Sequence, residues 1–99
     1  MDIELKVITS LLKLTKNGPV SHETINKDAK LPCETAKESL QTMQNKALIY
    51  VRDCTIRADS LQRVKLAIRA IELGADVERV ASLLQWKEFE SIAAVAFEE

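Results

Sequence analysis

The chain of 99 residues is long enough for one domain with a single modest core, and its 46% hydrophobic and 29% charged residues exclude an intrinsically disordered protein. Its formal net charge of −1 excludes a protein that is strongly basic along its whole length. Charge is uneven, because residues 51–75 hold five basic and three acidic residues, a net of +2, whereas residues 76–99 hold two basic and six acidic ones, a net of −4. An anionic partner is therefore expected to meet the middle of the chain.

Residues 2–18 have apolar residues at the spacing of one helical face, with Leu5, Ile8 and Leu12 pointing the same way. This spacing predicts a first helix. The helix is expected to end at Gly18, because glycine readily adopts the left-handed backbone of a helix end and the proline that follows cannot continue a helix.

Two further helices are predicted on either side of a tight turn. The first is short and lies within residues 20–30, because Ser21 can accept a hydrogen bond from a free amide of the first turn and Ile25 and Ala29 share one face. The second lies within residues 30–47. Its inward residues are expected to be Ala36, Leu40, Met43 and Ala47.

A β-hairpin is predicted within residues 48–58, because the apolar residues there alternate with polar ones instead of following a helical spacing. Ile49 and Val51 are expected to face inward. The turn at Asp53-Cys54 contains no glycine, which makes it an unfavourable sequence for a tight hairpin turn.

The remaining chain is predicted to be helical. One helix covers residues 59–74 with Asp59 or Ser60 as its cap, and a second covers residues 75–85 with Asp76 as its cap. The residues expected to face inward are Leu61, Val64, Ala67, Ile68 and Ile71 in the first helix and Val77, Val80, Ala81 and Leu84 in the second. A final apolar face is formed by Trp86, Phe89, Ile92, Ala93, Ala96 and Phe97.

This order of elements is typical of a winged helix-turn-helix, and residues 20–51 resemble that family. The matching positions are Ser21, Ile25, Ala29, Leu31, Pro32, Thr35, Ala36, Leu40, Met43, Ala47, Leu48 and Ile49. Ala47 stands where the family usually has glycine. The resemblance implies a mainly helical fold with a small β-hairpin: a winged helix-turn-helix over residues 1–58, and a C-terminal helical extension over residues 59–99 that packs on it as one structural unit.

In that family the helix after the turn enters the major groove of DNA and the hairpin touches the neighbouring backbone. The resemblance therefore places the polar side chains of the segment 33–45 toward the bases. Glu34 and Glu38 are among them, and a polyanion would repel both carboxylates. The alternative interpretation is a solvated helix face. Basic residues from Lys46 to Arg69 outnumber acidic ones by six to two, a local net of +4. The candidate DNA-binding residues are Thr35, Lys37, Gln41, Lys46, Arg52, Arg57 and Arg63.

Residues 66–99 resemble the connector and first nuclease helix of archaeal restriction-endonuclease-like proteins of the Mrr and Holliday-junction-resolvase type. Trp86, Phe89 and Glu90 match the motif "W-x-x-F-E" of that helix, and Gln85 stands where the family usually has a capping aspartate. The metal-binding strands of the nuclease would follow later and are not among the 99 residues. We therefore expect no catalytic residue, metal ligand or cofactor, and no enzyme activity.

The final apolar face lacks the nuclease sheet that covers it in that family. We therefore expect a homodimer in which the face contributes to the interface. The candidate dimer residues are Phe89, Ile92, Ala96 and Phe97. The functional hypothesis is a non-catalytic, weak and largely sequence-independent duplex DNA binder, alone or as the N-terminal domain of a nuclease-like protein.

The alternative is a protein-interaction adaptor in DNA repair, recombination or transcription that keeps the winged-helix scaffold. Cys33 and Cys54 are too few for a disulfide framework, and no signal peptide or membrane span is evident, so a cytoplasmic location is expected. No small-molecule substrate and no membrane partner are expected.

Overall fold

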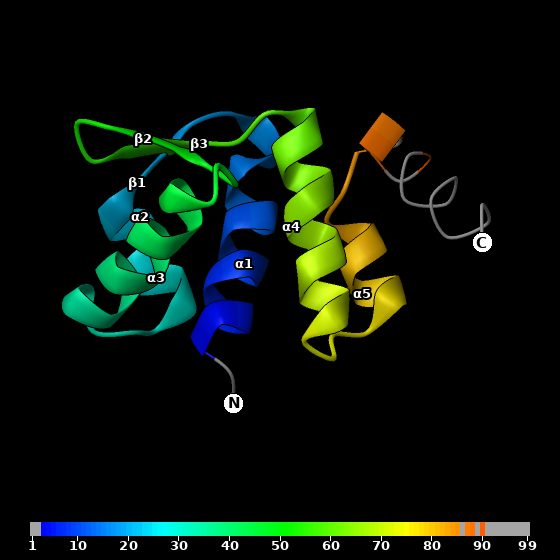
Figure 1. Cartoon of the computed structure of the whole chain (residues 1–99), viewed down its shortest axis with the longest axis horizontal. Coiled ribbons are helices and arrows are strands. Elements are labelled where there is room, and N and C mark those ends of the chain that lie inside the picture. Colours follow the sequence, from blue (N-terminus) through cyan, green and yellow to red (C-terminus); the bar gives the residue numbers. More distant parts are fainter. Residues whose placement is uncertain (1–2, 86, 89, 91–99) are drawn as a thin grey trace.

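The computed structural model describes residues 3–85, 87–88 and 90. The chain is mainly helical, with a small antiparallel sheet of three strands that lies across one end of the helices (Figure 1). The elements in chain order are α1 (Ile3–Leu14), the 3-10 turn η1 (Thr15–Asn17), β1 (Val20–Ser21), α2 (His22–Ala29), α3 (Cys33–Asn45), β2 (Tyr50–Arg52), β3 (Thr55–Arg57), α4 (Ser60–Glu72) and α5 (Val77–Ser82).

Side-chain caps begin three of the helices, as the sequence predicts. The Ser21 hydroxyl accepts from the Thr24 amide at the start of α2, and the Asp76 carboxylate accepts from the Glu78 amide at the start of α5. Asp59 starts α4 with a capping box, in which its carboxylate and the Gln62 side chain each accept from the other residue's backbone amide. These bonds satisfy amide groups that the first turn of a helix cannot pair internally.

The sheet contains one strand more than the predicted hairpin. β3 is the central strand and pairs with β2 on one side and with β1 on the other. Val20 and Val51 lie on either side of Ile56, so the three apolar side chains share the inner face of the sheet. Ile49 and Ile56 are fully buried, which confirms the predicted alternation of the hairpin.

One hydrophobic core joins both parts of the chain. Ile25 from α2 and Leu40 and Met43 from α3 lie in the same buried cluster as Leu66 from α4 and Val80 from α5. The cluster surrounds α1, which contributes Val7, Ile8, Leu11 and Leu12 to it. α1 therefore stands at the centre of the molecule, with α2 and α3 on one side and α4 and α5 on the other (Figure 1).

α4 is rotated relative to the predicted inner stripe. Leu61, which was expected to be inward, is 64% exposed, whereas Gln62 and Arg63 are buried together with Val64, Leu66, Ala67 and Ala70. In α5, Val80 is buried but Val77 is 55% exposed. The predicted inner face was therefore wrong for these residues. The face of α4 that packs on α1 and on Glu88 is wider than a purely apolar stripe, and it includes the polar side chains of Gln62 and Arg63, which are buried with hydrogen-bond partners.

Three places in the described chain have residues other than glycine in the left-handed region, the first of them Lys30 at the end of α2 with a φ of 56°. Asp53 and Cys54 form the hairpin turn with φ values of 50° and 65°, and Ala47 follows α3 with a φ of 59°. This is the region that residues with a side chain adopt at a cost of about 1–2 kcal/mol each. Ala47 therefore occupies a position at which glycine would fit better.

Candidate nucleic-acid interface

The outer face of the sheet carries two exposed arginines. The register places Tyr50 opposite Arg57 and Arg52 opposite Thr55, so these four side chains share the face that points away from the core. All four residues are exposed. Because no acidic residue occupies this face within the three strands, the surface formed by Tyr50, Arg52, Thr55 and Arg57, here called the sheet face, has a local charge of +2.

Tyr50 holds one of these arginines. The guanidinium carbon of Arg57 lies 5.3 Å from the centroid of the Tyr50 ring, which is a cation–π arrangement. Such a contact restricts the long arginine side chain while leaving its donors available to an anion. Arg57 was predicted as a DNA-binding residue and Tyr50 was not, although the alternation within the hairpin predicts both residues on the same face.

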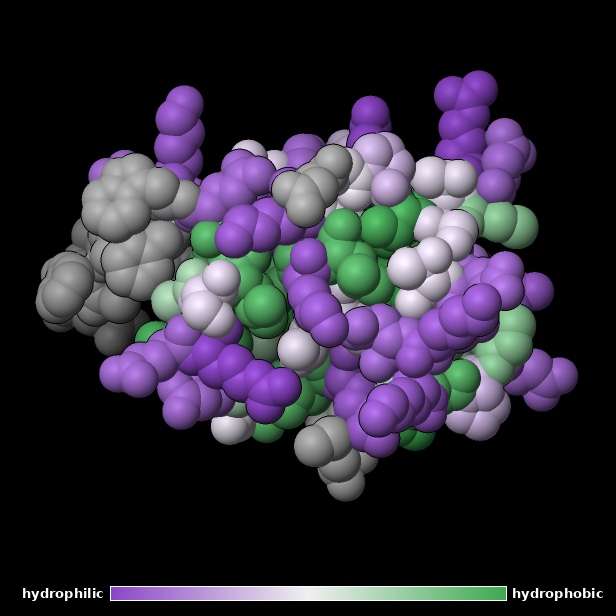
Figure 2. Space-filling model, turned by 180° about the vertical axis from the view of Figure 1, so that it is seen from behind, coloured by the Kyte–Doolittle hydropathy of each residue, from purple (hydrophilic) through white to green (hydrophobic). Residues whose placement is uncertain are grey.

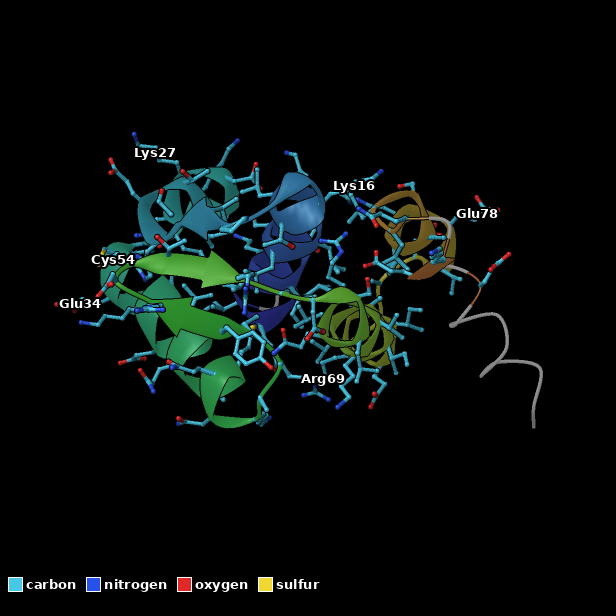
Figure 3. All side chains as sticks on the ribbon, turned by 90° about the horizontal axis from the view of Figure 1, so that it is seen from above. Lys16, Lys27, Glu34, Cys54, Arg69 and Glu78 are labelled. Atoms are coloured by element: carbon cyan, nitrogen blue, oxygen red, sulfur yellow. The ribbon has the colours of Figure 1, made fainter. Side chains whose placement is uncertain are left out.

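The hairpin turn projects away from α4 and α5. In Figure 3, Cys54 marks the tip of the turn, at the opposite end of the molecule from α5. The Cys54 carbonyl accepts from the His22 amide at 2.8 Å, which ties the tip to the start of α2. The turn is therefore a fixed and short projection, so any contact of the hairpin with a polyanion depends on the arginines of its strands.

The exposed side of α3 has a mixed charge. Lys37, Gln41, Glu34 and Glu38 are all exposed on it, and Thr35 is half-buried. Gln41 donates to the Asn45 side chain at 3.2 Å, so part of its hydrogen-bonding capacity is used within the helix. The structure therefore brings the predicted residues of α3 to the surface together with the two acidic residues that oppose an anionic ligand.

The sheet face borders a hollow beside the end of α3. Lys46 is exposed at the end of α3. The hollow has a volume of about 790 Å³ and is lined by Gln44 and Ala47 near the end of α3, by Tyr50, Arg52 and Arg57 of the hairpin strands, and by the acidic Asp53 of the turn, but not by Lys46. Of the predicted DNA-binding residues, Arg52 and Arg57 are therefore brought together at this hollow, and Lys46 is not.

Arg63 does not belong to this surface, and its assignment as a DNA-binding residue is wrong. Only 3% of Arg63 is exposed. Its Nε donates to both carboxylate oxygens of Glu88 at 3.0 Å, its Nη1 donates to the Thr15 hydroxyl at 2.6 Å, and its Nη2 donates to the Leu83 carbonyl at 2.8 Å. All three nitrogens of the guanidinium are thus engaged inside the protein.

A second arginine of the basic span is also engaged elsewhere. Arg69 donates to the Glu4 carboxylate at 3.1 Å and so joins α4 to α1. Two of the six basic residues from Lys46 to Arg69 are therefore engaged in contacts within the protein. The remaining exposed ones are Lys46, Arg52, Arg57 and Lys65.

Glu88 is the acidic residue that anchors the C-terminal segment. Its carboxylate also accepts from the Gln85 amide at 3.0 Å, which caps the helical turn that contains Lys87 and Glu88. The Gln85 side chain donates to the Lys16 carbonyl at 3.0 Å. Glu90, the residue that the nuclease resemblance singled out, is exposed. The predicted dimer residues Phe89, Ile92, Ala96 and Phe97 lie outside the described residues, as does Trp86.

Comparison of the chain with models of protein families, with curated proteins and with solved structures finds no match. Within the described part of the chain, no cluster of three or more histidine, cysteine, aspartate or glutamate side chains could hold a metal ion. Over the same residues, no helix is long and apolar enough to cross a membrane.

Proposed function

We propose that this chain is a non-catalytic winged helix-turn-helix protein that binds duplex DNA weakly, chiefly through phosphates. The observation that carries the proposal is the sheet face, where Arg52 and Arg57 are exposed at diagonal positions of the β2–β3 pairing and no acidic residue of the three strands shares the face, although Asp53 of the turn lines the same hollow. An exposed arginine can bind one phosphate with two parallel N–H···O hydrogen bonds. Phosphate contacts give affinity and orientation without reading a base sequence.

The arrangement of the elements supports the winged-helix interpretation. α2 and α3 are joined by a tight turn, and the hairpin follows α3 directly. The sheet is completed by β1, which lies between α1 and α2 in the chain and pairs with β3. Under this proposal the chain acts either alone or as the N-terminal DNA-binding domain of a restriction-endonuclease-like protein.

Replacement of both sheet-face arginines tests the proposal. We expect wild-type protein to bind a labelled duplex with a dissociation constant in the micromolar range at low salt, and to lose affinity steeply as salt is added. Arg52→Ala/Arg57→Ala is expected to lower the slope of log K against log salt by about one unit for each phosphate contact that is lost. Fluorescence anisotropy over a range of salt concentrations measures both quantities.

The matched control for that experiment is Arg79→Ala. Arg79 is exposed on α5, at the other end of the molecule from the hairpin (Figure 1). It should leave affinity and salt slope unchanged. Equal effects of the control and of the double variant would refute a specific role of the sheet face, and absence of duplex binding at low salt would refute the proposal altogether.

A protein-interaction adaptor is the second candidate, and the exposed side of α3 favours it. Glu34 and Glu38 both face solvent on the helix that would approach the bases. Two carboxylates in that position oppose a polyanion but suit a basic surface of a protein partner. Under this candidate no salt-dependent DNA complex forms, so Arg52→Ala/Arg57→Ala has no DNA affinity to change.

A further inference from the structure

The hollow beside the sheet face has apolar walls as well as cations. Its volume is about 790 Å³, and the apolar part of its lining is formed by Pro19, Ala47, Ile49, Tyr50 and Val51. The outside of a duplex presents phosphates and sugars, whereas its bases stay paired within, so a contact with the duplex backbone needs the arginines alone. The apolar lining therefore suits a part of a nucleotide that a closed duplex does not offer, the flat face of a base.

Tyr50 provides an aromatic surface in this hollow. The residue is 50% exposed, although the guanidinium carbon of Arg57 lies 5.3 Å from the centroid of its ring. The Arg57 contact therefore restricts the ring and still leaves half of the residue accessible. Unpaired bases stack on aromatic rings and on guanidinium planes, and they do so with little regard to sequence because every base has a π face. The pair formed by Tyr50 and Arg57 is therefore a stacking surface for an unpaired base.

Arg52 supplies a cation for the neighbouring phosphate. Arg52 and Arg57 both line the hollow, and neither forms an ion pair within the described part of the chain. Asp53 lines it as well, so the charge of the lining is two minus one, or +1. A net charge this small attracts phosphates only weakly, so the base must contribute part of the affinity. The exposed Gln44 amide at the same hollow can donate to and accept from a base edge.

A second hollow provides a comparison. It has a volume of about 530 Å³ and lies between α1, the end of α2, and α5 with the loop before it. In Figure 2, which views the molecule from behind, apolar side chains form the floor of a hollow that hydrophilic side chains frame. Cations also line the second hollow, Arg79 among them, but none of the described residues that line it is aromatic. Of these two hollows, only the one beside the sheet face therefore combines cations with an aromatic ring among the described residues.

We propose that the hollow beside the sheet face binds an unpaired nucleotide of a DNA strand, with its base on Tyr50 and Arg57 and its phosphate on Arg52. This rests on the proposed function, because it uses the same two arginines, and it adds a preference for DNA that exposes bases. A duplex with a single-stranded overhang satisfies both, since its paired part offers phosphates and its overhang offers bases. A blunt duplex offers phosphates only.

Strands with and without bases test the proposal on the full chain. The two probes are a labelled thymidine strand and a strand of equal length built of abasic nucleotides, which carries the same phosphates. Fluorescence anisotropy at low salt measures the ratio of the two affinities. We expect wild-type protein to bind the thymidine strand at least about 5-fold more tightly, the lower end of what one base stacked on an aromatic side chain contributes. Tyr50→Ala should lower this ratio to below about 2, and Tyr50→Phe, which keeps the ring, should preserve it.

The ratio cancels any effect that Tyr50→Ala has on the phosphate contacts of Arg57, because both probes share the phosphates, and binding of the abasic strand also shows that the variant is folded. Val77→Ala, which truncates a 55% exposed apolar residue on α5, is the control and should leave the ratio unchanged. The nucleotide proposal fails if wild-type protein binds both strands equally, or if Tyr50→Ala keeps the wild-type ratio. Either result, with a blunt duplex still bound, leaves the proposed function standing. Absence of binding to the strands and to the duplex alike would refute the proposed function and the nucleotide proposal together.

Discussion

Arg63 and Glu88 form a buried ion pair that fastens the C-terminal segment to α4, with the arginine Nε 3.0 Å from both carboxylate oxygens. The side chains are 3% and 1% exposed. The remaining donors of Arg63 bind Thr15 and the Leu83 carbonyl, and Glu88 also accepts from the Gln85 amide. Four segments of the chain therefore meet at one fully paired charge cluster.

Glu88→Ala is expected to destabilise the protein by about 3–5 kcal/mol, because it leaves the Arg63 guanidinium buried without a counter-charge. Glu90→Ala, two positions later and exposed, should change stability by less than about 0.5 kcal/mol. Urea unfolding followed by circular dichroism gives both values. A loss of less than about 1 kcal/mol for Glu88→Ala would show that the pair contributes little to the folded state.

Ala47→Gly is expected to stabilise the protein by about 0.5–1 kcal/mol. The φ of 59° at Ala47 strains a residue with a side chain, and this relief exceeds the added entropy that glycine brings to the unfolded chain. Its carbonyl accepts from the Gln62 side chain, a bond that the substitution keeps. Thermal and urea unfolding should both show the gain. Ala58→Gly is the control, since Ala58 is not in the left-handed region and glycine there should only destabilise.

The pKa of Asp28 lies below its ordinary value, chiefly because the Lys13 ammonium donates to its carboxylate; burial acts in the opposite direction, and the Ser10 hydroxyl adds to the lowering. A lowered pKa in the folded state stabilises the protein above the unfolded value of about 3.9, and this contribution is lost as pH falls through the folded value. Asp28→Asn should therefore lose less stability than the wild type between pH 7 and pH 3.

Unfolding by urea at the two pH values measures that difference. Glu23→Gln serves as the control, because the Glu23–Lys27 pair is 77% exposed at both side chains and should affect the pH dependence little. Equal losses for Asp28→Asn and the wild type would mean that the bonds to Asp28 are also present in the unfolded chain or do not stabilise the fold.

Glu34→Gln/Glu38→Gln is expected to tighten duplex binding several-fold at low salt, because two like charges leave the helix that faces the DNA in the proposed function. Glu78→Gln, on α5, provides the control for a change in net charge alone. Fluorescence anisotropy at a single low salt concentration is sufficient. If the glutamine pair leaves affinity unchanged while Arg52→Ala/Arg57→Ala abolishes it, α3 does not face the DNA.

Local signals in the sequence predicted much of the secondary structure. Ser21 and Asp76 were predicted as helix caps, and Asp59 was one of two candidates with Ser60, because a short polar side chain binds amides only a few residues away. The alternation around Ile49 and Ile56 predicted the inner face of the hairpin for the same reason, since side chains of a strand alternate whatever lies beyond it. The exposure of Arg52 and Arg57 follows from that alternation.

The tertiary structure decided the features that depend on distant partners. β1 is a strand because β3 lies beside it, and Val20-Ser21 alone is too short to signal one. Leu61 is exposed and Arg63 is buried because Thr15, Leu83 and Glu88 converge on Arg63 from three other segments of the chain. A charged side chain becomes a core residue only where such partners replace its water. The sequence by itself therefore determined the helices and strands, and only their packing determined which cations remain at the surface.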